Sequence, residues 1–129
     1  MLAHRTPQEA YRRVDFDARI AAAAPQELVL LCLEQFVGAT GSALVAHERA
    51  DNLLKSQSMT RALSAVTALQ IGIDGSIGIA AALTRFYDAA RRSLLDSVLK
   101  FDPAAVSALR QDFIEISRAM AASTSPRVA

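Results

Sequence analysis

The sequence contains no tryptophan and a single cysteine, and aromatic residues make up only 5% of its 129 positions. One cysteine cannot cross-link the chain, and Cys32 stands within an apolar run, so we expect it to be a small buried hydrophobe. Only five glycines and four prolines are present, while alanine, leucine, valine and isoleucine supply most of the apolar content. This composition favours an all-α fold, because few residues interrupt helices.

The chain also lacks an excess of either charge, since 14 basic and 13 acidic residues leave a net charge of +1. That balance indicates no nucleic-acid partner. No apolar stretch of signal-peptide length occurs near the start, so we expect a cytoplasmic protein without membrane insertion. Between Arg61 and Arg85 the only charge is Asp74, but the glycines and polar residues around Asp74 favour a turn between two helices over a membrane span.

Aliphatic residues at helical spacing run through most of the sequence. We predict a short helix after Pro7 and four long helices over residues 25–49, 52–73, 76–101 and from 103 onward. Asp51 and Asp102 are expected to cap the second and fourth of these long helices. Short connections make successive helices antiparallel, which predicts an up-down-up-down four-helix bundle with a short N-terminal accessory helix. The bundle is expected to form one domain over residues 1–122, followed by a disordered tail, 123–129.

The last three long helices each carry an apolar face that is predicted to point into the core. In chain order these residues are Leu63, Val66, Leu69, Ile73; Ile79, Leu83, Phe86, Ala90, Leu94, Val98; and Val106, Leu109, Phe113, Ile116, Met120. The first long helix differs, because residues 28–33 are all apolar and one core cannot cover its whole circumference. We expect a partner to cover the second side. Gly38 and Gly41 within this helix suggest either close approach of another backbone, which we favour, or local softness of the helix.

Several short motifs occur in a fixed order along the chain. They begin with Ala10-Tyr11, continue with a Pro-x-Glu-Leu start of the first long helix, and include a Tyr-Asp pair followed by arginine in the third. The residues concerned are Ala10, Tyr11, Pro25, Glu27, Leu28, Val29, Leu31, Asp51, Arg61, Ala62, Ile73, Asp74, Gly75, Ile79, Ala80, Phe86, Tyr87, Asp88, Arg92 and Leu94. Over residues 10–120 the chain resembles FliS, the family of flagellar secretion chaperones. Leu33, Glu34 and Gln35 replace the Tyr-Asp-Gly usual in that family, which indicates a divergent member.

The resemblance implies a chaperone that binds the C-terminal segment of flagellin in the cytoplasm and prevents its polymerisation before type III flagellar export. In this family the client wraps around the bundle, and the chaperone's own N-terminal segment can cover part of that surface. A component of the export gate is a further expected partner. The client-binding residues implied are Tyr11, Leu28, Leu31, Phe36, Ile73, Leu83, Phe86 and Tyr87. For Tyr11, a core contact of the short helix and a plug in the client groove both stay open. The alternative for Tyr87 is a solvated helix face, and core membership is the alternative for the others.

No catalytic residue, metal or cofactor is expected. His4 and His47 lie apart, with no carboxylate or thiol at metal-binding spacing. Asp88 and Arg92 are spaced for an ion pair on a solvated helix face. The competing function is that of a helical adaptor or homodimeric interaction module with a different client, and a monomer or a weak homodimer is expected. A DNA-binding domain is a weaker alternative, because the arginines of the third long helix stand in a nearly neutral chain.

Overall fold

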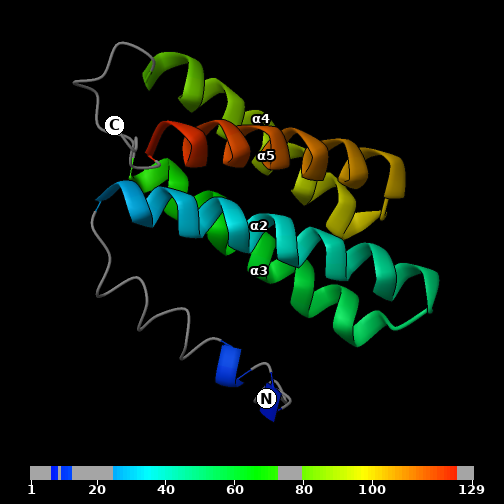
Figure 1. The fold of residues 1–129 in the computed structure, drawn as a ribbon. Helices are drawn as coiled ribbons and strands as arrows, with labels where there is room; N and C mark the ends of the chain where they lie inside the picture. The colour runs from blue at the N-terminus through cyan, green and yellow to red at the C-terminus, as the bar shows by residue number, and fades with distance from the viewer. Residues whose placement is uncertain (1–6, 9, 13–24, 73–79, 125–129) are drawn as a thin grey trace.

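The computed structural model describes residues 7–8, 10–12, 25–72 and 80–124, and nearly all of these residues are helical. Four long helices follow one another along the chain: α2 (Pro25–Glu48), α3 (Asn52–Ile71), α4 (Ala80–Leu99) and α5 (Pro103–Thr124). Each helix packs against its neighbours in sequence, and α5 also packs against α2. Successive helices run in opposite directions (Figure 1). The predicted all-α, up-down-up-down bundle is therefore confirmed, with α2 diagonal to α4 and α3 diagonal to α5.

Local signals set the boundaries of these helices. The Asp51 carboxylate accepts a hydrogen bond from the Leu54 N–H at 3.0 Å, which caps α3 as predicted. The Asp102 carboxylate accepts from the Ala104 and Ala105 N–H groups at 3.1 and 3.2 Å, which caps α5. The first long helix begins at Pro25 as predicted.

All four helices end at other residues than predicted: α2 ends at Glu48, one residue early, and α4 ends at Leu99, two residues early. The α3 helix ends at Ile71, where the Gly72 N–H donates to the Ala68 carbonyl at 3.0 Å. The predicted terminus at Ile73 and the turn after it lie outside the described residues. The α5 helix continues to Thr124, two residues into the predicted tail, because no helix-breaking residue precedes Pro126.

Replacing Asp51 by alanine is expected to lower the free energy of unfolding by about 0.5–2 kcal/mol, because the first turn of α3 loses the acceptor for its Leu54 N–H. Urea unfolding followed by circular dichroism measures this loss. An Asp96→Ala variant is the control, since Asp96 is also an exposed acidic residue but lies inside α4. A loss no larger than that of the control would show that the cap contributes nothing to stability.

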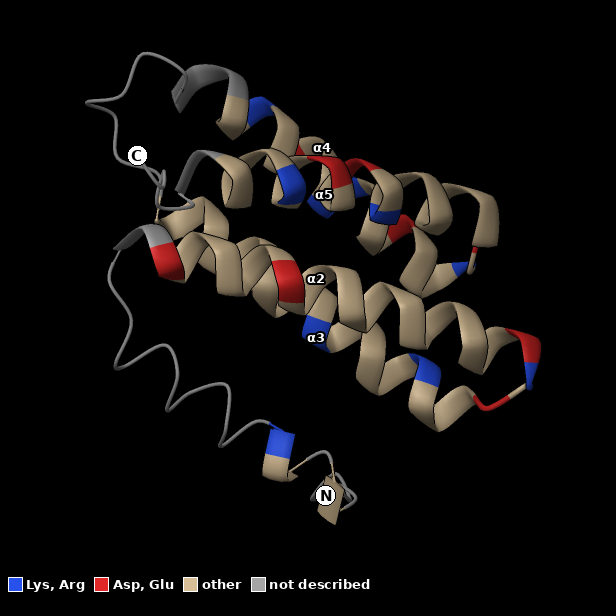
Figure 2. Ribbon diagram, in the orientation of Figure 1, with Lys and Arg blue, Asp and Glu red and all other residues tan. Residues whose placement is uncertain are grey.

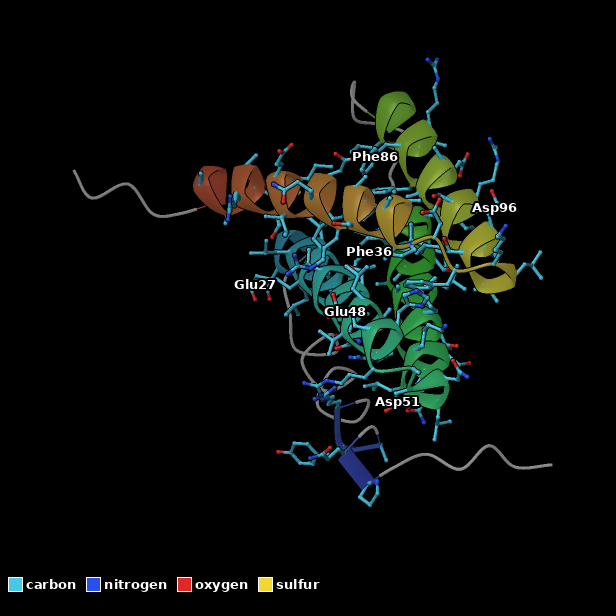
Figure 3. The ribbon with its side chains drawn as sticks, turned by 90° about the vertical axis from the view of Figure 1, so that its right-hand side faces the viewer. Glu27, Phe36, Glu48, Asp51, Phe86 and Asp96 are labelled. Atoms are coloured by element: carbon cyan, nitrogen blue, oxygen red, sulfur yellow. The ribbon has the colours of Figure 1, made fainter. Side chains whose placement is uncertain are left out.

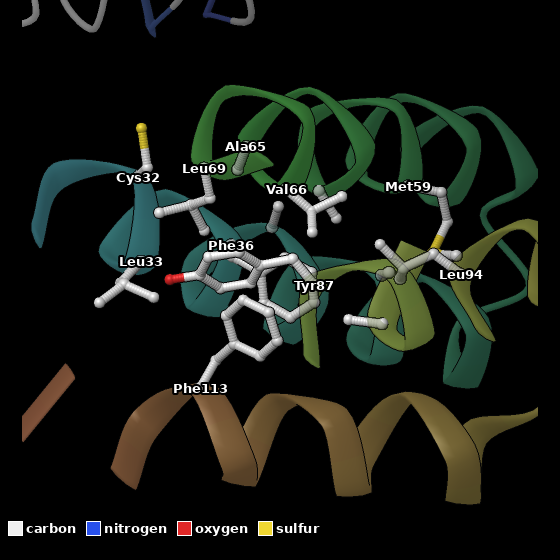
Figure 4. Close-up of a cluster of buried hydrophobic side chains, with 14 residues drawn as sticks. Cys32, Leu33, Phe36, Met59, Ala65, Val66, Leu69, Tyr87, Leu94 and Phe113 are labelled. Atoms are coloured by element: carbon white, nitrogen blue, oxygen red, sulfur yellow. The ribbon is translucent and has the colours of Figure 1, made fainter. Parts of the chain in front are cut away.

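The core runs along the centre of the bundle, and α2 and α3 contribute small alanines to it as well as large side chains. Ala39 and Ala43 on α2, and Ala62 and Ala65 on α3, are all buried. Their small side chains allow the two helix backbones to approach closely, and α2 makes its most extensive contact with α3. Figure 4 shows the large members of the core between the helices. These are Leu33, Phe36, Met59, Val66, Leu69, Tyr87, Leu94 and Phe113.

The orientation of α4 differs from the predicted one by a fraction of a turn. Its buried residues Tyr87, Ala90, Leu94 and Ser97 follow helical spacing, so the line facing the core passes through Tyr87 and Ser97. Val98, predicted to point inward, is 54% exposed. The prediction that Tyr87 belongs to a solvated face is likewise wrong, because its side chain is buried.

The predicted close approach of another backbone at Gly38 and Gly41 is also wrong. A Cβ atom at Gly38 would meet no atom within 4 Å. At Gly41 a Cβ would lie 3.1 Å from Nε of Arg110, so the near neighbour is a side chain of α5. Gly41 thus provides space for the Arg110 guanidinium beside α2.

Candidate functional site

The residues predicted to bind a client divide into two half-buried pairs at one end of the bundle. Leu28 and Leu31 lie in the first two turns of α2, and Leu83 and Phe86 lie in the first two turns of α4. Because both helices are antiparallel to α3, their first turns lie at the same end of the bundle. Since α2 and α4 are diagonal, however, the two pairs do not form one continuous surface. We call them the α2 pair and the α4 pair.

The α2 pair lies on the helix that has more apolar surface than the core uses. The described hydrophobic residues that pack against the core from a half-buried position include Val29 and Val37 of α2, but neither Leu28 nor Leu31. By length and composition alone, the stretch Glu27–Glu48 is long and apolar enough to cross a membrane. Only 33% of its most apolar 18-residue segment is buried in the bundle. A core helix of a soluble protein passes the same test. The helix therefore presents apolar surface beyond its contribution to the core.

The α4 pair lies where α4 moves away from α5. Figures 1 and 3 both show the N-terminal part of α4 diverging from α5, and the contact between these two helices is the smallest of the four seams. Phe86 meets Phe113 of α5 across this seam, with the ring centroids 5.1 Å apart. Half-buried residues of α5, Ile116 and Met120, also pack against the core. The seam thus leaves apolar side chains partly open to solvent.

Polar contacts on the opposite edge of α4 fix this helix to α3. Gln70 Nε2 donates to the Asp88 carboxylate at 2.6 Å. Arg91 Nη1 donates to Thr67 Oγ1 at 2.6 Å. Asp88 is thus bonded to another helix, in addition to lying at ion-pair spacing from Arg92. Because two directed hydrogen bonds hold α4 on the α3 side, a ligand on the α5 side would meet a positioned helix.

Two of the predicted client-binding residues lie inside the core. Phe36 and Tyr87 are buried, and the Phe36 ring stacks on Phe113 with centroids 3.7 Å apart. In this conformation both side chains have almost no surface that a partner could contact. Tyr11 is 74% exposed, so its ring is neither a core contact nor a plug in this structure. Ile73 lies outside the described residues.

The side chains of this region give no indication of catalysis. Among the described residues, no group of three His, Cys, Asp or Glu side chains is placed to hold a metal ion. Burial raises the pKa of the Cys32 thiol, which keeps it protonated and unreactive. Figure 2 shows acidic and basic residues on the same helices, an arrangement that does not favour a nucleic-acid surface.

Alkaline pH is expected to destabilise the fold through two buried groups. Burial raises the pKa of Cys32, and burial with a smaller contribution from Cys32 raises the pKa of the Tyr87 hydroxyl. Both groups therefore bind their protons more tightly in the folded state. The stability that these two protonated groups contribute is fully present below the ordinary thiol pKa of about 8.5. It is lost as pH rises through their raised folded-state pKa values.

Urea midpoints measured between about pH 8 and about pH 11 should fall with rising pH, since this range includes the ordinary pKa values of a thiol and of a tyrosine hydroxyl. The Tyr87→Phe variant retains the ring but removes the hydroxyl, so its midpoint should fall less steeply. Cys32→Ala should remove the earlier part of the decline. A midpoint that is constant or rises over this range would contradict the assignment of these groups.

Comparison with known proteins places the whole bundle in one family. The family model described as flagellar protein FliS matches residues 7–123, which include α2, α3, α4 and all but the last residue of α5. The chain belongs to the FliS family. A comparison with curated protein sequences gives no match. The family implies a flagellar export chaperone with flagellin as its client.

Sequence reasoning missed part of what surrounds the α4 pair. Ile116 and Met120 were assigned to the core face of α5, and their half-buried state shows only in the packing. The bonds that fix α4 to α3 were also missed. A polar residue at each of Thr67 and Gln70, on the side of α3 next to α4, was the available signal.

Proposed function

We propose that this FliS family member binds the C-terminal segment of flagellin through the α2 pair and the α4 pair, and so prevents polymerisation before export. The observation that supports this most directly is the incomplete burial of Leu28 and Leu31 on an otherwise apolar helix. A client that contacts both pairs has to pass around the end of the bundle, because α2 and α4 are diagonal. A segment that is unfolded when free can do so, at the cost of becoming ordered.

The proposed chaperone acts by masking rather than by chemistry. A polymerising terminus that is bound along apolar helix faces cannot pair with another flagellin subunit. Binding to several separate apolar sites also keeps the segment from folding on itself. We further propose that the protein acts in the cytoplasm, where the client is made, and that a component of the export gate receives the complex.

Isothermal titration of the full chain with a peptide of the flagellin C-terminal segment tests the proposal. We expect one peptide bound per chain, with a negative heat-capacity change from apolar burial. A peptide of the same composition in scrambled order is the control. Failure to bind the native segment, or equal binding of the scrambled peptide, would favour the adaptor function with a different client.

A further inference from the structure

Arg110 of α5 is a half-buried cation at the contact between α5 and α2. Its guanidinium lies over Gly41, where an added Cβ atom would stand 3.1 Å from Nε and 3.7 Å from Nη2. The Nε atom is buried and has no hydrogen-bond partner among the residues that the structure describes. A guanidinium keeps its charge at every pH relevant to a folded protein, and a buried donor without an acceptor is unfavourable. The bundle therefore leaves Arg110 in need of an acceptor.

The carboxylates nearest to Arg110 along the two helices are out of its reach. On α2, Glu34 and Glu48 each lie seven residues from Gly41, about 10 Å along the helix axis. On α5, Asp112 lies two positions from Arg110 and faces another side of the helix. The positions one turn before and after Arg110, from which an ion pair within α5 would form, hold uncharged residues: Val106, Ser107, Phe113 and Ile114. Neither helix thus supplies a carboxylate to this guanidinium.

The surface that leads from the α2 pair toward Arg110 is open. Leu31, Gly38 and Val45 are seven residues apart, so they share one face of α2. A Cβ atom at Gly38 would meet no atom within 4 Å, and Val45 is 41% exposed. Gly41 follows one turn after Gly38, about 15 Å along the helix from Leu31. Because glycine has no side chain, a bound segment can lie directly on the α2 backbone between Leu31 and Arg110.

We propose that Arg110 binds the C-terminal carboxylate of the client, an inference that rests on the proposed function. The proposed client segment is a chain end, so it carries this carboxylate whatever its side chains are. A segment that contacts Leu28 and Leu31 and continues along α2 brings its last residue beside Gly41. There the guanidinium donates two parallel hydrogen bonds to the carboxylate. The cation that α2 and α5 leave unpaired thus fixes where the client ends.

This contact also gives the chaperone a means of selecting a chain end. An internal amphipathic segment of similar hydrophobicity can cover the same apolar side chains, but it has no terminal carboxylate. Binding such a segment leaves Arg110 covered and still without an acceptor, which is unfavourable. Selection therefore depends on the penalty for the wrong segment as well as on the contact with the right one.

Isothermal titration of the full chain with two forms of the flagellin C-terminal peptide tests the inference. The two forms have the same sequence and end in a free carboxylate or in a carboxamide, so only the terminal charge differs. The free acid is expected to bind at least about tenfold more tightly, as a charge-assisted contact predicts. Equal affinity of the two forms would overturn the inference.

Substitution of Arg110 tests whether this residue causes the preference. Arg110→Gln should weaken binding of the free acid by the same factor as amidation and leave the affinity of the carboxamide unchanged. Arg110→Lys keeps the charge but loses the paired N–H groups, so it should retain part of the preference. Arg118→Gln is the matched control, because Arg118 is an exposed arginine two turns further along α5, and it should bind both forms as the wild-type chain does. Far-UV circular dichroism checks that each variant is folded.

The remaining outcomes separate this inference from the proposed function. An equal loss for both peptide forms in Arg110→Gln would assign the contact to an acidic side chain of the client and not to its terminus. A preference for the free acid that persists in Arg110→Gln would place the carboxylate at another residue. Either result, or equal affinity for the two forms, removes only this inference, whereas failure of both forms to bind removes the proposed function with it.

Discussion

Replacing Phe113 by alanine is expected to lower the free energy of unfolding by about 3–5 kcal/mol, the cost typical of a fully buried phenylalanine. Phe113 is completely buried and stacks on Phe36 of α2 at 3.7 Å. Its ring also lies 5.1 Å from Phe86 and 6.3 Å from Tyr87, both on α4. One side chain of α5 thus holds together helices that are diagonal to each other, and its loss leaves a cavity between three helices.

Urea unfolding monitored by far-UV circular dichroism measures this effect, and Phe101→Ala is the matched control. Phe101 is half-buried and lies outside the aromatic cluster, where it stacks on His47 at 4.5 Å with the Lys55 ammonium 5.1 Å from its ring. Its loss removes one ring from the edge of the bundle, so we expect less than half the effect of Phe113→Ala. Equal losses would show that the cluster has no special role in stability.

The helices themselves were predictable because their ends depend on adjacent residues. Asp51 and Asp102 act on N–H groups two or three positions ahead, and Pro25 begins a helix through its own ring geometry. The order of the bundle follows from short connections. None of these inferences requires knowledge of residues far away in the sequence.

The orientation of each helix about its own axis was less predictable. In α4, Phe86 and Tyr87 are adjacent aromatic residues, and sequence spacing favoured Phe86 as the inward one. Packing instead buries Tyr87 among Phe36 and Phe113, which turns Val98 to solvent and Ser97 inward. The choice depends on the shape left by α2 and α5, which the pattern of α4 alone does not contain.

The same limit applies to the candidate site. An excess of apolar residues on α2 was evident from residues 28–33, but which of them remain outside the core depends on where α3 and α5 pack. Phe36 was predicted to bind the client, with core membership as the alternative, and the fold places it at the centre of the core. Leu28 and Leu31 were predicted with the same two alternatives, and they are left half-buried.

The Leu31→Asp variant is expected to weaken binding of the flagellin C-terminal segment by about ten- to a hundredfold, which corresponds to about 1.4–2.7 kcal/mol. Leu31 is half-buried and does not pack against the core cluster, so a carboxylate there should disrupt the apolar contact and leave the fold intact. Titration calorimetry gives the affinity, and urea unfolding shows that stability is retained.

The matched control for Leu31→Asp is Leu53→Asp. Leu53 is a leucine in the first turn of α3, 59% exposed, at the end of the bundle opposite to the α2 pair. The two variants therefore introduce the same charge on a helix, and only Leu31 belongs to the proposed client surface. If both variants bind the client with wild-type affinity, α2 does not belong to that surface and the α4 pair alone binds the client. Equal and large losses would instead indicate that the client extends over both ends of the bundle, because the half-buried residues of α2 would then be only part of a longer contact.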